Sequence, residues 1–160
     1  MGIQRLRGAP ALVAIVIVIA AGSVALTAGP AAASTPPPAG WCYGDYCSGM
    51  DPHTTRHVPD GNYCDADGTT VASIQAAGTG LLVELRWSSR CQANWARVPA
   101  SFGSYSPGSV KARQCDTGYQ QVGVVDSNTG YSWTAMIYSP SHPVSASWSG
   151  SPGNYATACV

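Results

Sequence analysis

Charged residues are scarce in this chain, and lysine, glutamate and phenylalanine are almost absent. Asp, Glu, Lys and Arg make up 10% of the 160 residues, and Lys111 and Glu84 are the only lysine and the only glutamate. Binding to nucleic-acid phosphates needs clustered Lys and Arg side chains, so the composition argues against a nucleic-acid partner.

Motifs of catalysis and metal binding are also missing. The sequence has no Gly-x-Ser-x-Gly, and therefore no nucleophile elbow. It has no Cys-x-x-Cys pair, because four residues separate Cys42 from Cys47, and this argues against zinc. Nothing in the sequence indicates a cofactor, and we expect none.

The longest apolar run stands at the N-terminus and has the layout of a secretory signal peptide. Arg5 and Arg7 precede an apolar stretch that runs from Ala9 to about Ala28. Three alanines then place small residues before a cleavage point at Ser34. A retained anchor is the alternative, because the run is nearly long enough to span a bilayer of roughly 30 Å. The small residues favour cleavage, so we expect a secreted bacterial protein that has no membrane contact after residues 1–33 are removed.

The expected mature chain has a Pro-rich tether at residues 34–40 and a single domain at residues 41–160. Loss of Arg5 and Arg7 leaves six basic and eight acidic residues, a net charge of about −2. A domain of this size that is rich in Gly, Ser and Pro buries a modest apolar surface, so cross-links should matter to its stability.

All six cysteines lie in the mature chain, and an even number in a secreted protein predicts three disulfides. The six are Cys42, Cys47, Cys64, Cys91, Cys115 and Cys159. Six cysteines allow fifteen connectivities, and their number does not choose among them. Each bridge should contribute roughly 2–4 kcal/mol, mainly by restricting the unfolded chain.

The remaining pattern predicts a mostly β fold, a small disulfide-stapled β-sandwich or open barrel with long loops and at most a short helical turn. Strand-like stretches occur at residues 70–76, 81–87, 109–114, 119–126 and 130–139. The last two are predicted to form a hairpin, and residues 70–76 leave a short helix open as the alternative. Residues 91–98 fit a strand or one helical turn, residues 42–68 a loop layer pinned by cysteines, and the tail from Ser141 an irregular segment held by Cys159.

Tryptophan and tyrosine dominate the aromatic residues, and both keep one polar edge. We expect Trp87, Trp95 and Trp133 in the core, since few other large apolar side chains are present. Tyrosines predicted in loops are the candidates for surface binding, namely Tyr43, Tyr46, Tyr105 and Tyr155.

Metal binding has two candidate segments. His53 and His57 are four positions apart, and Asp60 would complete a three-ligand set, although flanking prolines disfavour the helix that would align them. Residues 60–68 carry enough oxygen ligands for calcium, but their spacing is not that of a twelve-residue calcium loop. A solvated loop is the simpler interpretation of both segments and of His142.

Hydrolysis has one candidate acid, Glu84, which Arg86 accompanies on the same predicted strand. A glycosidase needs a second carboxyl group within reach, and Asp45 and Asp51 are the available partners. A salt-bridged structural carboxylate is the alternative role for Glu84.

Three stretches together resemble a family of secreted bacterial proteins of unknown function, the YjfA-like proteins. They run from Cys42 to Pro52, from Cys64 to Ala66 and from Glu84 to Arg97, and the stretch from Tyr131 to Pro140 is similar to a later strand of that family. Similar domains also look to occur as outward-facing parts of membrane-tethered helix-turn-helix regulators. The resemblance implies a scaffold and an extracellular location, and it implies no activity.

The chain departs from the pattern of that family at two places. The segment between Pro52 and Cys64 is longer and carries both histidines, and Cys115 and Cys159 look like additions. The resemblance therefore implies a Cys115–Cys159 pair beside two family bridges, Cys42–Cys47 and Cys64–Cys91.

Arginines in the matched stretch add to the binding candidates. Arg86, Arg90 and Arg97 are placed to contact nearby tryptophans or carboxylates, and they knit strand to loop unless they bind a ligand. The sequence favours a non-enzymatic binding or interaction module at the cell envelope or in the medium, with a wall component or an extracellular protein as partner. The alternatives are a small secreted hydrolase of wall glycan or polymer and an extracellular inhibitor or toxin-like factor.

Overall fold

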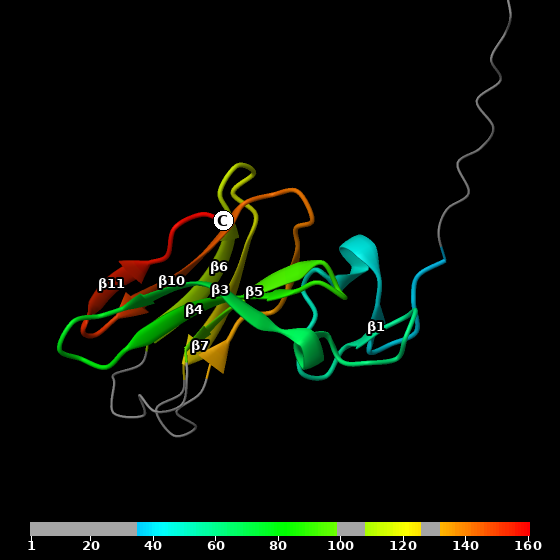
Figure 1. Cartoon of the computed structure of the whole chain (residues 1–160), viewed down its shortest axis with the longest axis horizontal. Helices are drawn as coiled ribbons and strands as arrows, with labels where there is room; N and C mark the ends of the chain where they lie inside the picture. Colours follow the sequence, from blue (N-terminus) through cyan, green and yellow to red (C-terminus); the bar gives the residue numbers. More distant parts are fainter. Residues whose placement is uncertain (1–34, 99–107, 126–131) are drawn as a thin grey trace, which may run out of the picture. The chain divides into compact units, whose positions relative to one another are not determined.

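The computed structural model describes residues 35–98, 108–125 and 132–160 (Figure 1). The predicted signal peptide at residues 1–33 lies outside the described residues. Residues 35–40 of the predicted tether form neither strand nor helix, and the Tyr43 hydroxyl donates to the carbonyl of Thr35 over 2.8 Å. In the part of the chain that is described, no helix is long and apolar enough to cross a membrane.

One antiparallel sheet contains the strand that the sequence marks most clearly. Its strands are β3 (Thr69–Gln75), β4 (Leu82–Ser88), β5 (Ala93–Val98), β8 (Ser132–Trp133) and β9 (Ile137–Tyr138). They run in the order β3-β4-β5-β8, and β9 also pairs with β5. Val83 and Leu85 of β4 are fully buried on one face, as the two-residue period of a strand requires.

The second antiparallel sheet has the order β11-β10-β6-β7. Its strands are β6 (Gly108–Gln114), β7 (Gln120–Val125), β10 (Val144–Gly150) and β11 (Gly153–Ala156). Buried Val144, Ala146 and Trp148 alternate with serines along β10, so one face of this strand is apolar and the other polar.

The two sheets pack face to face around one apolar cluster (Figure 1). Leu85 and Ala96 come from one sheet, Val110 and Trp148 from the other, and all four side chains have at most 1% of their surface exposed. The predicted mostly β, disulfide-stapled fold is confirmed, and both sheets are open.

Residues 41–68, which we call the N-terminal layer, pack beside β5, and the Cys64–Cys91 disulfide links them to the turn before that strand (Figure 1). The layer contains β1 (Trp41–Cys42), β2 (Arg56–His57) and two short 3₁₀ turns, η1 (Gly44–Cys47) and η2 (Cys64–Asp67). Its buried cysteines pack against Trp95 of β5 and Met136. Gly68 lies so close to Trp95 that a Cβ atom would stand 2.8 Å from the indole ring, so a larger residue would push the layer outward.

The predicted hairpin of residues 119–126 with 130–139 is wrong. β7 pairs with β6, while β8 and β9 cross to the other sheet and pair with β5. In the crossed arrangement Met136 and Ile137 are completely buried, and burial of such apolar side chains stabilises it. Gly123 of β7 lies directly against the carbonyl of Trp133, so the two segments face each other from different sheets.

The irregular tail predicted from Ser141 is also wrong, because β10 is an interior strand and β11 follows it. Residues 70–76 and 91–98, for which the sequence left a helix open, form β3 and β5. Of the three tryptophans predicted in the core, Trp95 is buried, whereas Trp87 and Trp133 are half-buried. Tyr155 lies on β11 and not in a loop, and Tyr105 lies outside the described residues.

Candidate functional site

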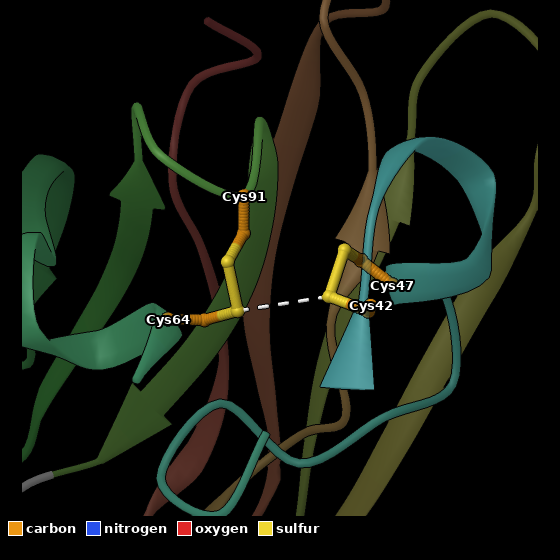
Figure 2. A group of neighbouring side chains, drawn as sticks. All are labelled: Cys42, Cys47, Cys64 and Cys91. Atoms are coloured by element: carbon orange, nitrogen blue, oxygen red, sulfur yellow. Dashed lines mark hydrogen bonds between the residues drawn. A yellow bond between two sulfur atoms is a disulfide. The ribbon is translucent and has the colours of Figure 1, made fainter. Parts of the chain in front are cut away.

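The three disulfides are Cys42–Cys47, Cys64–Cys91 and Cys115–Cys159, so the pairing that the resemblance implied is confirmed. The first two lie side by side in the N-terminal layer, with the Sγ atoms of Cys42 and Cys64 3.7 Å apart (Figure 2). Both are buried, whereas Cys159 of the third is exposed.

The three candidate carboxylates of a hydrolase each have a different local partner. Glu84 is buried, forms an ion pair of 2.8 Å with Arg97 and accepts a hydrogen bond of 2.8 Å from Thr70. Asp45 accepts a bond from the Ser48 hydroxyl, and Asp51 accepts one from the N–H of His53. None of these contacts joins two of the carboxylates, and the partners of Glu84 fit the structural role considered from the sequence.

The three candidate arginines contact the chain that surrounds them. Arg86 donates to the Thr70 hydroxyl over 2.7 Å and to the carbonyl of Gly68. Arg90 forms an ion pair with Asp60, and Arg97 pairs with Glu84 as described. The Arg86 and Arg90 contacts connect β4 and the turn after it to the N-terminal layer. Ligand binding by these arginines stays a prediction.

Tyr43 and Tyr46 flank the first disulfide, and their rings meet edge to face with centroids 5.3 Å apart. Tyr46 is 40% exposed, and Tyr43 is half-buried. The pair forms a small, partly exposed aromatic surface. Binding of a ligand there stays a prediction.

The candidate metal ligands lie apart in pairs. His53 contacts Asp65 and packs on the Trp133 ring, with centroids 4.2 Å apart. His57 lies 3.3 Å from Asp60. Burial lowers the pKa of His57 below its ordinary value, and the positive charge of Arg90 lowers this pKa further. The two histidines therefore serve different carboxylates.

Asp67 joins the acidic loop to the turn between β4 and β5. Its carboxylate accepts bonds of 2.6 Å from Ser88, 2.8 Å from Ser89 and 2.9 Å from the N–H of Arg90. Burial alone would raise the pKa of Asp67, but these hydrogen bonds outweigh burial and hold it below the usual value. Among the described residues, one group of three or more His, Cys, Asp or Glu side chains is close enough to hold a metal ion, namely Cys42, Cys47, Cys64 and Cys91.

Two adjacent hollows that the sequence did not reveal lie beside the segment Pro140–His142, and together we call them the Pro140–His142 groove. Their volumes are about 540 and 450 Å³, and both are lined by Pro140, Ser141 and His142. The first hollow is further lined by Val71, Trp87, Asn94, Ser139, Pro143 and Val160. The second is further lined by Asp45, Ser48, Gln114, Tyr119 and Tyr138.

Irregular backbone brings hydrophobic groups to the first hollow. The register between β3 and β4 shifts between Thr70 and Ala72, and Val71 at this bulge is 43% exposed. Trp87 is the cross-strand partner of Asn94 at the end of the β4–β5 pairing, where the packed core gives way to the groove.

Internal hydrogen bonds fix the walls of the groove. Ser139 donates to the Asn94 side chain over 2.7 Å, and Gln114 donates to the carbonyl of Tyr138 over 3.0 Å. His142 pairs with Asp116 over 2.7 Å, and this hydrogen bond holds the pKa of Asp116 below its ordinary range. Both amides are buried, so they hold the shape of the groove and leave ligand contact to the aromatic and hydroxyl groups.

Three residues of this groove were assigned other roles from the sequence. Asp45 was a catalytic candidate, Trp87 was expected in the core, and His142 was expected in a solvated turn. The signal that was available is the aromatic and proline content of the segment from Tyr138 to Pro143. Its neighbours in the groove come from seven separate parts of the chain, so no local pattern could assemble them.

Comparison with known proteins gives a family and no activity. The chain matches the model of a family described as proteins of unknown function (DUF2690) over residues 45–147. No curated protein and no solved structure matches it. The match covers most of the chain, including both disulfides of the N-terminal layer apart from Cys42, together with strands of both sheets. The chain therefore belongs to the DUF2690 family of proteins of unknown function.

Proposed function

We propose that this chain is a secreted bacterial binding module that holds a neutral, hydroxyl-rich polymer of the cell envelope in the Pro140–His142 groove. The single observation that carries the proposal is the lining of the two joined hollows, which combines aromatic side chains with hydroxyl groups and, over the described residues, includes no Lys or Arg.

This lining favours a saccharide over a charged ligand. Trp87, Tyr119 and Tyr138 offer flat apolar faces with polar edges, which suit a ring that carries hydroxyl groups. An anionic ligand would find no Lys or Arg among the described residues of the groove and would meet the carboxylate of Asp45. Two adjacent hollows that share three lining residues also suit an extended chain better than a single small molecule.

The expected location rests on the covalent scaffold and on the N-terminus. Three disulfides in a small domain are typical of extracellular proteins. The apolar N-terminal run supports secretion, and the resemblance to YjfA-like secreted bacterial proteins supports the same compartment.

Sedimentation with purified, insoluble bacterial cell wall tests the proposal, with zymography on the same material. We expect the oxidised mature domain to sediment with the wall and to leave it intact. Ser141→Trp should reduce retention at least tenfold, about 1.4 kcal/mol, because Ser141 is exposed and shared by both hollows, so the added ring fills the groove without removing a core contact.

Val122→Ala is the matched control, since Val122 is exposed on β7 outside the groove and should leave retention unchanged. Unchanged retention of the Ser141→Trp variant, or no retention of the parent chain, would overturn the proposal. Clearing of the wall would favour the hydrolase alternative. Inhibition of protease activity, or of the growth of competing cells, by a chain that the wall does not retain would favour the inhibitor or toxin-like factor.

A further inference from the structure

Four cysteine sulfurs form a cluster where the N-terminal layer contacts the turn before β5 (Figure 2). Cys42 and Cys47 come from β1 and η1, Cys64 begins η2, and Cys91 lies in the turn before β5. All four Sγ atoms lie within 4.8 Å of one another, although two disulfides would be complete without any such contact.

We propose that reduction of these two disulfides converts the cluster into a four-cysteine site for Zn²⁺. The site lies outside the Pro140–His142 groove and does not depend on the proposed binding function. In the oxidised chain the same sulfurs are bonded in pairs and carry no thiolate that could bind metal.

The closest approach between the two disulfides matches the spacing of sulfurs in a tetrahedral zinc site. Zinc–sulfur bonds of about 2.3 Å in a tetrahedron place neighbouring sulfurs roughly 3.8 Å apart. The Cys42 and Cys64 sulfurs are already 3.7 Å apart, and every other pair lies within 4.8 Å. Reduction frees the bonded sulfurs to separate, so the backbone needs no large rearrangement to present four ligands.

The surroundings fit a closed structural site better than a catalytic one. The four cysteines have at most 2% of their surface exposed, and Trp95, Met136 and Ala93 pack against them. Such a shell leaves no open coordination position for water or substrate. The spacing of Cys42 and Cys47, which argued against zinc because it is not Cys-x-x-Cys, still falls within the two to four residues that commonly separate paired zinc ligands. The fold adds Cys64 and Cys91, which no sequence spacing indicated.

The conversion balances with a dithiol as reductant. Each disulfide takes two electrons and two protons from one dithiol, which closes to a cyclic disulfide, and four protein thiols result. Zn²⁺ then binds four sulfurs and releases their four protons, so binding is favoured by rising pH. The zinc would hold the same parts of the layer that the disulfides hold in the oxidised chain.

Cobalt titration of the full-length chain tests this site. The chain is reduced with a dithiol, separated from the reductant without oxygen and titrated with Co²⁺, which reports tetrahedral thiolate binding by its visible and near-ultraviolet absorption. We expect one Co²⁺ per chain, displaced by one Zn²⁺, and no binding by the oxidised chain. Amide exchange should show that Zn²⁺ restores protection to the N-terminal layer of the reduced chain.

Two variants separate this site from ordinary thiol binding. Cys64→Ser should weaken Co²⁺ binding at least about 100-fold, because even the loss of an outer partner of a zinc ligand costs 10–100-fold. The control Cys115→Ser/Cys159→Ser removes the exposed disulfide and should bind as the parent does. The proposal is overturned by failure of the reduced parent to bind, by equal binding of Cys64→Ser, or by weakened binding of the control.

Discussion

The N-terminal layer and the sandwich beneath it are stabilised by different means. The layer has two strands of two residues each, and its buried centre is formed largely by two disulfides. The sandwich has four strands of seven residues, a continuous apolar core and one exposed disulfide at its C-terminal tail.

Carboxylate contacts are concentrated in the layer. The carboxylates of Asp60, Asp65 and Asp67 all accept contacts in or next to the layer, from His57, His53 and the Ser88–Arg90 turn. The sandwich has the pairs Glu84–Arg97 and Asp116–His142, and its core cluster is formed by apolar side chains. Covalent and charged contacts therefore stabilise the layer, which has too few apolar residues to build a core of its own. A substitution in the layer should destabilise only the layer, whereas one in the sandwich core should destabilise the whole domain.

The largest effect is expected from Trp148→Ala, which empties the centre of the sandwich. Trp148 is 1% exposed and packs on residues of both sheets. Truncation of a buried tryptophan costs roughly 3–5 kcal/mol, and we expect the whole domain to lose that stability in one transition by denaturant titration. Val122→Ala, at a position 51% exposed, is the control and should stay within about 0.5 kcal/mol. A loss of stability confined to β10 and β11 would contradict the expected cooperative unfolding of the sandwich.

Removal of the Cys64–Cys91 disulfide should open the layer and spare the sandwich. The link spans 27 residues, for which the loop-entropy relation gives a loss of about 3–4 kcal/mol. We expect Cys64→Ala/Cys91→Ala to lower the free energy of opening of residues 41–68 by that amount in amide exchange, while the amides of β4, β6 and β10 keep their protection. An equal loss in all three strands would show that the layer and the sandwich unfold as one unit.

The same contrast explains what the sequence could predict of the fold. Val83, Leu85 and Trp87 alternate with the charged residues Glu84 and Arg86, so β4 was evident from the chain alone. The apolar positions of β10 alternate only with serine and include Ala146, so their contrast is weak and the strand was mistaken for an irregular tail. β7 was paired with the wrong neighbour because sequence proximity favours a hairpin, while burial of Met136 and Ile137 favours the crossing.

Of the candidate sites, only the disulfides could be predicted from the sequence. Cysteine number and the family resemblance predicted the bridges, yet the contact of Cys42 with Cys64 depends on how the layer packs on β5. Nor could the groove be predicted, because Val71, Trp87 and Val160 converge on Pro140 only after both sheets have formed.

Asp67→Asn tests how much the polar contacts stabilise the layer. The substitution removes the charge that accepts bonds from Ser88, Ser89 and Arg90, and we expect a loss of about 1–2 kcal/mol. Because the folded-state pKa of Asp67 lies below the unfolded value, its stabilisation is complete above about pH 4 and is lost as the pH falls through the folded-state pKa. Denaturant titrations from pH 7 to pH 2 should therefore show the difference between parent and variant shrinking at the acidic end.

Asp45→Asn is the control for that series, since Asp45 is exposed and accepts a single side-chain bond, and its effect should stay within about 0.5 kcal/mol. A difference for Asp67→Asn that is the same at pH 7 and pH 2 would show that the carboxylate charge does not stabilise the layer.

The smallest effect is expected from His57, which reports the electrostatics of the layer rather than its packing. Burial and the charge of Arg90 lower its pKa in the folded chain, and the negative charge of Asp67 opposes them only in part. The unfolded chain therefore takes up a proton near pH 6.5 while the folded chain does not, so the parent loses stability as the pH falls from about 7, with the loss complete below the folded-state pKa. His57→Gln should remove this slope, and in the parent the ring, followed by NMR, should titrate below 6.5. Titration of His57 above 6.5 would mean that Asp60, 3.3 Å away, dominates over Arg90 and that the layer gains stability on acidification instead.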